Sequence, residues 1–354
     1  MTSGMILAHG VGRVYELPLP LSLYLGGAGA TVLVSFLIRA LAPGERPLAR
    51  PRRLLGAGGA RILARVLRIG GAVALVLALG AGALNDEGGL TTAPLLLWVG
   101  LVVGMIVLSS VIGGAWRAAD PWAGLERLYR APEQDPVATS APPWWLGPAS
   151  LYALFWFELV SGVGFDGFWV LVALLVYSLY ALSFRERWGE KWADADPLSI
   201  LFGFASRAAP LRLRSDGIFY VGPLAGLDER RAMPLTLFAS LFVILASTTL
   251  DNVRETVGWT SFKSSVGLEA VPSMIVDSAA LALFTLLFFL PLLLAVAIAR
   301  TWLGRDRSVI EVSRRFGWSL IPIAIAYVLA HNAPLLIIGI PQLVRELSDP
   351  FALG

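Results

Sequence analysis

Apolar residues in this chain come in long, nearly unbroken runs, and each run is close to the 20 or so residues that a helix needs to cross a bilayer. The runs occupy residues 20–42, 66–84, 93–115, 146–163, 167–184, 234–250, 272–302 and 317–343. The pattern predicts an all-α polytopic membrane protein with about eight transmembrane helices. We expect residues 1–354 to form a single transmembrane domain.

Polar segments divide this predicted domain. Its parts are a tail (1–19), helices one to five (20–184), a basic loop (185–233), helices six to eight (234–343) and a second tail (344–354). In the loop, residues 197–209 are amphipathic, and residues 211–221 have the strand, Asp-Gly turn, strand pattern of a small β-hairpin. We expect the loop to be mainly a solvated surface that fixes orientation. Asp120 and Pro121 predict a capped interfacial helix that runs to Tyr129.

The arginines orient the predicted helices. Of the 28 lysine and arginine residues, 24 fall in or beside every second connecting segment, and Arg13, Arg254, Lys263 and Arg345 fall on the other side. Because cationic residues are retained on the cytoplasmic face, the hairpin should be cytoplasmic and both termini extracytoplasmic. The outer side then carries a net charge of −7 and the inner side +10. An acidic outer rim attracts cations, and a basic inner rim suits anionic lipid headgroups.

Composition supports a membrane location and excludes several kinds of site. The chain is 56% hydrophobic and 15% charged, whereas soluble domains are about 25% charged. It has no cysteine, which excludes disulfides, thiolate metal sites and a cysteine nucleophile. The tail before the first run lacks a charged n-region, so we expect it to be retained rather than cleaved as a signal peptide. The expected partners are the lipid bilayer and other membrane subunits, with no nucleic acid.

Few ionisable residues interrupt the apolar runs, and they lie at similar depths. Counting 1.5 Å of rise per residue from the inner ends puts Glu158 at roughly 16 Å, Asp251 at 24 Å and His331 at 21 Å. Asp277 lies at about 22 Å on the same scale. Four ionisable groups from four helices are therefore predicted in the outer half of the membrane, where such residues usually mark function.

Three interpretations of this layer are compatible with its residue types. The first is a metal site with His331, His9, Glu158, Asp251 and Asp277 as ligands; imidazole with carboxylate suits zinc, copper, iron or manganese. Such an ion could activate water for hydrolysis. The second is a proton or ion relay of the kind found in transporters. The third is structural: the groups satisfy one another's hydrogen bonds between packed helices.

His9 is the only other histidine and lies in the N-terminal tail. Gly10 and Gly12 permit the backbone to approach other groups closely, so the tail could fold over the outer mouth of the site. The alternative is an ordinary disordered tail.

Several sequence blocks resemble the bacterial integral membrane proteins of the fenitrothion hydrolase-like family. The blocks are residues 8–13, 16–20, 116–122, 157–160, 247–251, 326–331 and 347–350, in this order along nearly the whole chain. The resemblance implies a multi-pass protein of the bacterial cytoplasmic (inner) membrane, and it implies hydrolysis of a phosphoester-like substrate. It points to His9, Glu158, Asp251 and His331.

The predicted function is therefore metal-dependent hydrolysis at an outward-facing buried site, with Glu158 or Asp251 as the catalytic base. The alternatives are a non-catalytic subunit of a membrane complex and an ion- or proton-coupled transporter. Metal content, a co-purifying partner or flux in liposomes would discriminate among the three.

Overall fold

The computed structural model describes residue 30 and residues 51–84, 90–129, 140–227, 231–303 and 308–351. All statements about the fold and its contacts refer to these residues. The first predicted helix (20–42) and His9 lie outside them, apart from Ala30.

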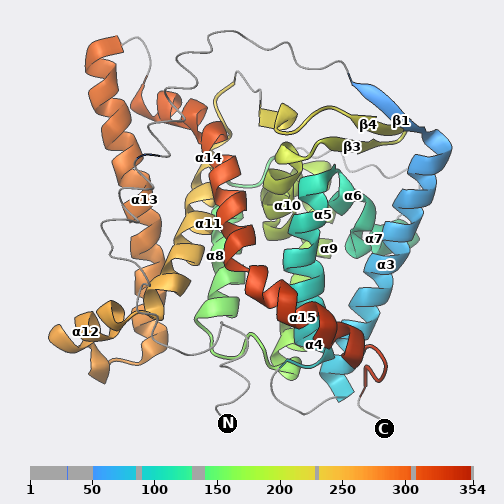
Figure 1. The fold of residues 1–354 in the computed structure, drawn as a ribbon, viewed down its shortest axis with the longest axis horizontal. Helices are drawn as coiled ribbons and strands as arrows, with labels where there is room; N and C mark the ends of the chain where they lie inside the picture. Colours follow the sequence, from blue (N-terminus) through green and yellow to red (C-terminus); the bar gives the residue numbers. More distant parts are fainter. Residues whose placement is uncertain are drawn as a thin grey trace.

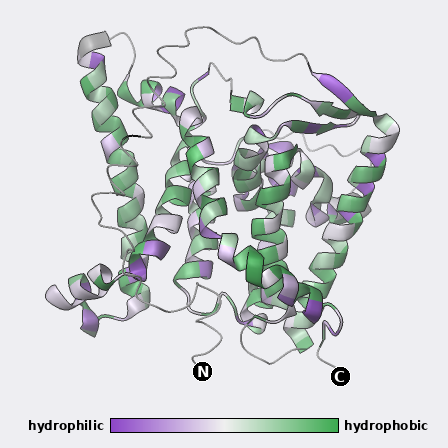
Figure 2. Cartoon of the chain, viewed as in Figure 1, coloured by the Kyte–Doolittle hydropathy of each residue, from purple (hydrophilic) through white to green (hydrophobic). Residues whose placement is uncertain are grey.

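Five helical stretches of the described chain are long and apolar enough to cross a membrane. They are α3 (Ala57–Leu84), the stretch Thr92–Val111, the stretch that begins with α9 (Gly167–Trp188), α11 (Leu235–Arg254) and α13 (Ser273–Leu303). The second comprises α4 (Thr92–Leu95), the π-helical η1 (Leu96–Val103) and α5 (Gly104–Val111). Figure 2 shows apolar residues along these helices and polar residues gathered toward their ends. The chain is thus a mainly helical membrane-spanning protein.

Burial separates central helices from peripheral ones. In the most apolar stretch of each helix, 72% of residues are buried in α11, against 11% in α13 and 6% in α3. Figure 1 accordingly places α11 near the middle and α13 and α3 at opposite flanks. Leu286, Leu290 and Leu294 of α13 are exposed, which suits a lipid-facing surface.

The predicted fourth helix is shorter than its apolar run. Helix α8 covers Leu146–Leu159, 14 residues, although the run continues to residue 163. The helix ends before Gly162, which adopts a left-handed backbone conformation with φ of 74°. Asp166 then caps α9 by accepting a hydrogen bond from the Trp169 amide. Helix α8 packs against α11 and α10 and lies within the bundle.

The last predicted helix is broken. Helix α14 (Val309–His331) and helix α15 (Ala333–Glu346) meet at an angle of 51°, so 317–343 is not one straight helix. The physical reason is Pro334 in the first turn of α15, because proline cannot donate the backbone hydrogen bond that would continue α14. Counted as one span, the pair makes a sixth candidate in the described residues.

The expectation for the basic loop was wrong in one part. After η2 (Gly189–Asp194), helix α10 (Pro197–Ala208) is not a solvated element but packs against α5 and α8 in the bundle. Ile200, Leu201 and Phe202 are almost completely buried. Each of these side chains is more stable buried than exposed to water, by roughly 1.5–3 kcal/mol, which favours the position of the helix inside the bundle.

The predicted hairpin is present and belongs to a larger sheet. Strands β3 (Leu211–Arg214) and β4 (Gly217–Tyr220) pair antiparallel around the turn. Strand β1 (Arg52–Gly56) pairs antiparallel with β4, and β2 (Ile112–Gly113) pairs parallel with β3. The order is β1-β4-β3-β2.

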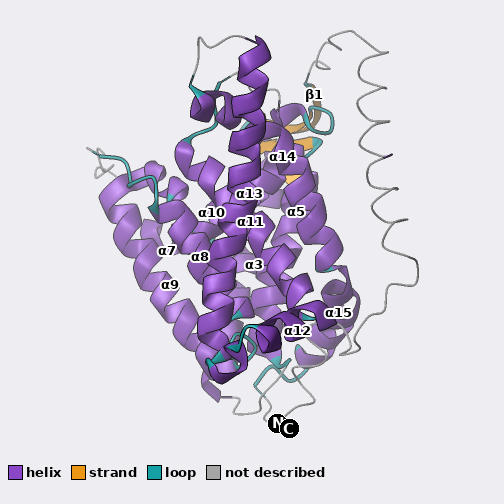
Figure 3. Ribbon diagram, turned by 90° about the vertical axis from the view of Figure 1, so that its left-hand side faces the viewer, coloured by secondary structure: helices purple, strands orange, loops and turns teal. Residues whose placement is uncertain are grey.

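The remaining short elements complete the two ends of the bundle. They are α6 (Ala115–Ala119), α7 (Pro121–Tyr129), η3 (Ala225–Leu227), α12 (Val257–Ser265) and η4 (Leu268–Ala270). The predicted capped helix is confirmed in α7, where Asp120 Oδ1 accepts from the amides of Trp122 and Ala123 at 3.0 and 3.1 Å. The sheet lies at one end of the bundle, and α12 and α15 lie at the other (Figures 1 and 3).

Candidate functional site

Three roughly parallel helices bring the candidate residues to the same end of the bundle. Helices α11 and α14 both start near the sheet and end toward α12 and α15 (Figure 1). The end of α8 meets the end of α11, where the Arg254 guanidinium donates to the Leu159 carbonyl. Glu158 lies one residue before the end of α8, Asp251 in the last turn of α11, and His331 is the last residue of α14.

Asp251 and His331 form a direct pair. The His331 Nε2 atom lies 2.8 Å from Asp251 Oδ2, a short separation for a hydrogen bond that involves a charged group. Asp251 is 6% exposed, and the His331 side chain is about one-fifth exposed. The carboxylate therefore fixes the orientation of the imidazole ring at a partly enclosed position.

A small cavity adjoins this pair. Its volume is about 20 Å³, which is room for about one water molecule. Side chains of α5, α8, α10, α11 and α14 line it together with η1 and Asn332. The lining residues are Val102, Ile106, Phe155, Glu158, Leu159, Leu201, Ser247, Thr248, Asp251, Val328, His331 and Asn332. Three of the predicted site residues, Glu158, Asp251 and His331, thus share one polar cavity with an apolar surround.

The hydroxyl groups in the cavity wall form hydrogen bonds to the backbone. Ser247 and Thr248 donate to the Ile244 carbonyl at 2.9 and 3.2 Å. Their protons are thereby engaged, so neither hydroxyl is arranged as a nucleophile that hands its proton to His331. Asn332 also turns back, donating from Nδ2 to the Val328 carbonyl at 3.0 Å.

Asp277, the fourth carboxylate of the predicted layer, does not line this cavity. It lies in the second turn of α13 and pairs with Arg254, with Nε 3.4 Å from Oδ2. It is 6% exposed, and within the described chain its Oδ1 atom has no hydrogen-bond partner. Asp277 therefore belongs to the contact between α13 and the end of α11.

Among the residues that the structure describes, no three histidine, aspartate or glutamate side chains are placed so that they could hold one metal ion, so these residues do not form a complete metal site. Asp251 and His331 supply two suitable ligands in contact. His9, the further predicted ligand, lies outside the described residues. A zinc, copper, iron or manganese centre thus stays a prediction.

A second buried polar cluster lies near the sheet and was missed by sequence reasoning. Arg185 of α9 pairs with Asp120 and lies 3.8 Å from Glu126, and its guanidinium stacks 4.8 Å from the centre of the Trp192 ring. Asp196, which is fully buried, caps α10 by accepting from the Ser199 amide at 2.9 Å.

Asp196 has further partners in the same cluster. It accepts from the Tyr177 hydroxyl at 2.7 Å and from the Ser199 hydroxyl. The signal for this site is visible in the sequence, because Asp196-Pro197 repeats the Asp120-Pro121 pattern of a capped helix start.

No protein-family model, no curated protein and no solved structure matches this chain.

Proposed function

We propose that this membrane protein transfers protons through the Glu158–Asp251–His331 cavity as part of proton- or ion-coupled transport. The observation that supports the proposal is a histidine–aspartate pair at 2.8 Å beside a cavity that has room for about one water molecule and is also lined by Glu158. A site of this size suits a proton carried by water. Sites for small organic molecules usually enclose about 300–1,000 Å³.

The proton steps need only the groups around the cavity. Histidine changes charge most readily near neutral pH, and Asp251 stabilises the charged imidazolium through Nε2. His331 would then exchange a proton with cavity water through Nδ1, and Glu158 would accept it from that water. The first transfer takes the proton from a ring nitrogen to the water oxygen, and the second takes it from that water to a carboxylate oxygen of Glu158, so no other reactant is required.

The distribution of arginines indicates how the protein is oriented in the membrane. Arginines cluster beside the sheet, in β1, in β3 and at the start of α3, whereas Asp251, Glu255 and Glu269 lie toward the opposite end. We infer that the sheet faces the cytoplasm of a bacterial inner membrane and that the cavity opens toward the outside, with both termini there.

Hydrolysis is the second candidate, because the Asp251–His331 pair has the arrangement of an oriented general base. Such a base would remove a proton from cavity water, which would then attack a phosphoester-like substrate. The resemblance to fenitrothion hydrolase-like proteins favours the same chemistry. A bulky substrate would require the cavity to open at the bend between α14 and α15. No step is routed through a metal, since the described ligands do not complete a metal site.

Proton flux in liposomes tests the first candidate. Purified protein is reconstituted with an internal pH-sensitive dye, and a pH gradient is applied. We expect His331→Gln and Glu158→Gln to lower the flux at least tenfold. Glu346→Gln, at an exposed ion pair with Arg345, serves as the matched control and should leave the flux unchanged.

Other outcomes would contradict proton transfer. Flux that both cavity variants retain would exclude this route. Near-stoichiometric metal that His331→Ala removes, together with phosphoester cleavage, would favour the hydrolase. A protein without flux or metal that co-purifies with a partner would instead be a subunit of a membrane complex.

A further inference from the structure

A cavity much larger than the one at His331 lies between α12 and the start of α13. Its volume is about 510 Å³, within the range of sites that bind small molecules. The residues that line it are Thr260, Lys263, Leu268, Glu269, Ala270, Val271, Pro272, Ser273 and Val276. None of them belongs to the proton-transfer cavity.

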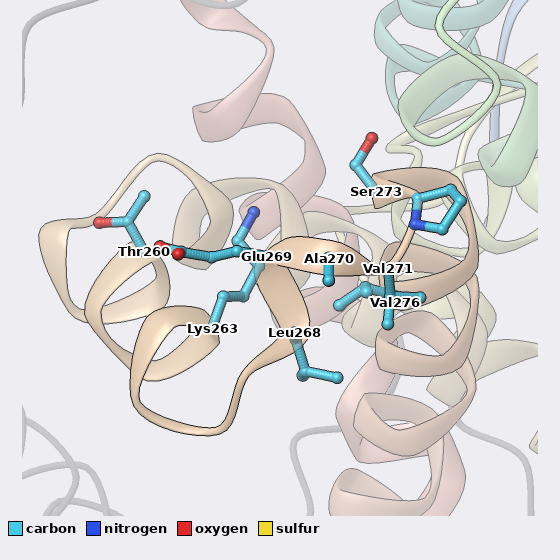
Figure 4. A pocket seen from close by; sticks show the side chains of 9 residues that line it. Thr260, Lys263, Leu268, Glu269, Ala270, Val271, Ser273 and Val276 are labelled. Atoms are coloured by element: carbon cyan, nitrogen blue, oxygen red, sulfur yellow. The ribbon is translucent and has the colours of Figure 1, made fainter.

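The lining combines opposite charges with an apolar wall. Figure 4 shows Thr260, Lys263 and Glu269 on one side of the cavity, and Val271 and Val276 on the other. Within the described residues, Lys263 and Glu269 form no ion pair with each other or with another side chain. One ammonium and one carboxylate therefore face the same space and can each bind a group of opposite charge.

The position of the cavity indicates where its ligand comes from. Helix α11 ends at Arg254 and α13 begins at Ser273, and both are candidate membrane spans, so the segment between them lies at a membrane face. No residue of α12 is buried.

The surface around the cavity is apolar. Phe262 and Val266 are about half exposed, and so are Met274 and Ile275 on the first turn of α13. Apolar side chains around a charged site suit a lipid, whose acyl chains would cover them, better than a ligand from water.

We propose that this cavity binds the headgroup of a zwitterionic aminophospholipid. The Lys263 ammonium pairs with the lipid phosphate, Glu269 pairs with the lipid amine, and the acyl chains lie along Phe262, Val266 and Ile275. The Thr260 hydroxyl already donates to the Val257 carbonyl at 2.9 Å, so the Ser273 hydroxyl is the one that donates to a remaining phosphate oxygen. Since both charges of the headgroup are matched, the site selects phosphatidylethanolamine over phosphatidylglycerol, which lacks the amine.

Lipid retention measured by native mass spectrometry tests the assignment. The full chain is purified from nanodiscs that contain equal amounts of phosphatidylethanolamine and phosphatidylglycerol. The wild type should retain about one phosphatidylethanolamine per chain. Because a charge-assisted contact is lost, Lys263→Gln should lower retention of both lipids roughly tenfold.

Glu269→Gln gives a sharper result, because it should still bind a lipid but lose the preference for the amine. Arg345→Gln is the matched control: an exposed cation at the same end of the bundle, whose removal should leave retention unchanged. Lys263 and Glu269 have no partner inside the described fold, so the variants should keep the wild-type midpoint of thermal unfolding.

Two results would overturn the assignment. One is equal retention of phosphatidylethanolamine by the wild type, Lys263→Gln and Glu269→Gln. The other is thermal stabilisation of the lipid-free protein by soluble phosphoethanolamine, lost in Lys263→Gln, with no lipid retained; the cavity would then serve a water-borne ligand. Neither outcome bears on proton transfer at His331, which the liposome experiment tests separately.

Discussion

Among the described residues, the ionisable cluster near the sheet and the Asp251–His331 pair differ in whether space adjoins them. Near the sheet, Asp120, Arg185 and Asp196 have charged or hydrogen-bonding partners and no cavity beside them among the pockets described. At the other end, Asp251 and His331 pair beside room for about one water.

This difference separates a structural role from a chemical one. A buried ion pair with no space beside it mainly positions helices, and removing one partner leaves the other charge in an apolar interior. A pair next to water can exchange protons without moving its helices. The cluster near the sheet should therefore dominate stability, and the His331 cavity should dominate activity.

The largest expected effect is the loss of stability in Arg185→Ala. The variant leaves Asp120 buried without its cation, which typically costs about 3–5 kcal/mol. The midpoint of thermal unfolding in detergent, followed by tryptophan fluorescence, should fall sharply. Arg187→Ala is the control, because Arg187 is exposed two residues away in the same helix, and it should have little effect. Equal decreases in the unfolding midpoint of the two variants would show that the ion pair does not stabilise the fold.

Asp196→Ala should rank second. It removes the cap of α10 and the acceptor for the Tyr177 hydroxyl, for an expected loss of about 2–3 kcal/mol. Asp166→Ala provides the comparison, since Asp166 caps α9 but is only half-buried, and it should cost about 1 kcal/mol. Comparing the two unfolding midpoints shows how much burial adds to the effect of losing a helix cap. A larger loss of stability in Asp166→Ala than in Asp196→Ala would contradict the expected contribution of burial.

At the His331 cavity, Asp251→Asn should have a small effect on stability and a large effect on activity, the opposite of the variants near the sheet. Asparagine keeps the shape and a hydrogen bond to His331, so the expected loss of stability is only about 1 kcal/mol. Proton flux should nevertheless fall at least tenfold, because the amide cannot stabilise the imidazolium. A variant with wild-type flux would show that the pair is structural, like its counterpart near the sheet.

The smallest effect is expected for Tyr327→Phe. Tyr327 joins α14 to α11 by accepting from Asn252 Nδ2 at 3.1 Å, close to the cavity but outside its lining. Removing this one hydrogen bond should cost about 0.5 kcal/mol and leave the flux intact. A large loss of flux would mean that helix packing near the site, and not the titrating groups, limits the activity.

The meeting of Glu158, Asp251 and His331 could be predicted from the sequence, because each helical residue adds a fixed rise along its helix. That count placed Glu158, Asp251, Asp277 and His331 at one level, and three of the four share a cavity. It could not predict that Asp277 lies apart, since the direction in which a helix face points depends on packing between helices. Asp277 instead pairs with Arg254, with Nε 3.4 Å from Oδ2.

The burial of helix α10 could not be predicted from the sequence either. It is short and follows charged residues, and arginines flank it, so its pattern is that of a surface element. Only the tertiary fold provides the space between α5 and α8 that buries Phe202 and Phe204. The hairpin was predicted because its Asp-Gly turn is local, whereas its pairing with β1 and β2 joins segments far apart in the chain.

The four-stranded sheet has a mechanical consequence. Strand β1 leads directly into α3, β2 follows α5, and the hairpin joins them through backbone hydrogen bonds. Backbone hydrogen bonds therefore link α3, α5 and the segment after α10 at this end of the bundle, whereas α13 and α14 add no strand to the sheet and pack mainly against α11.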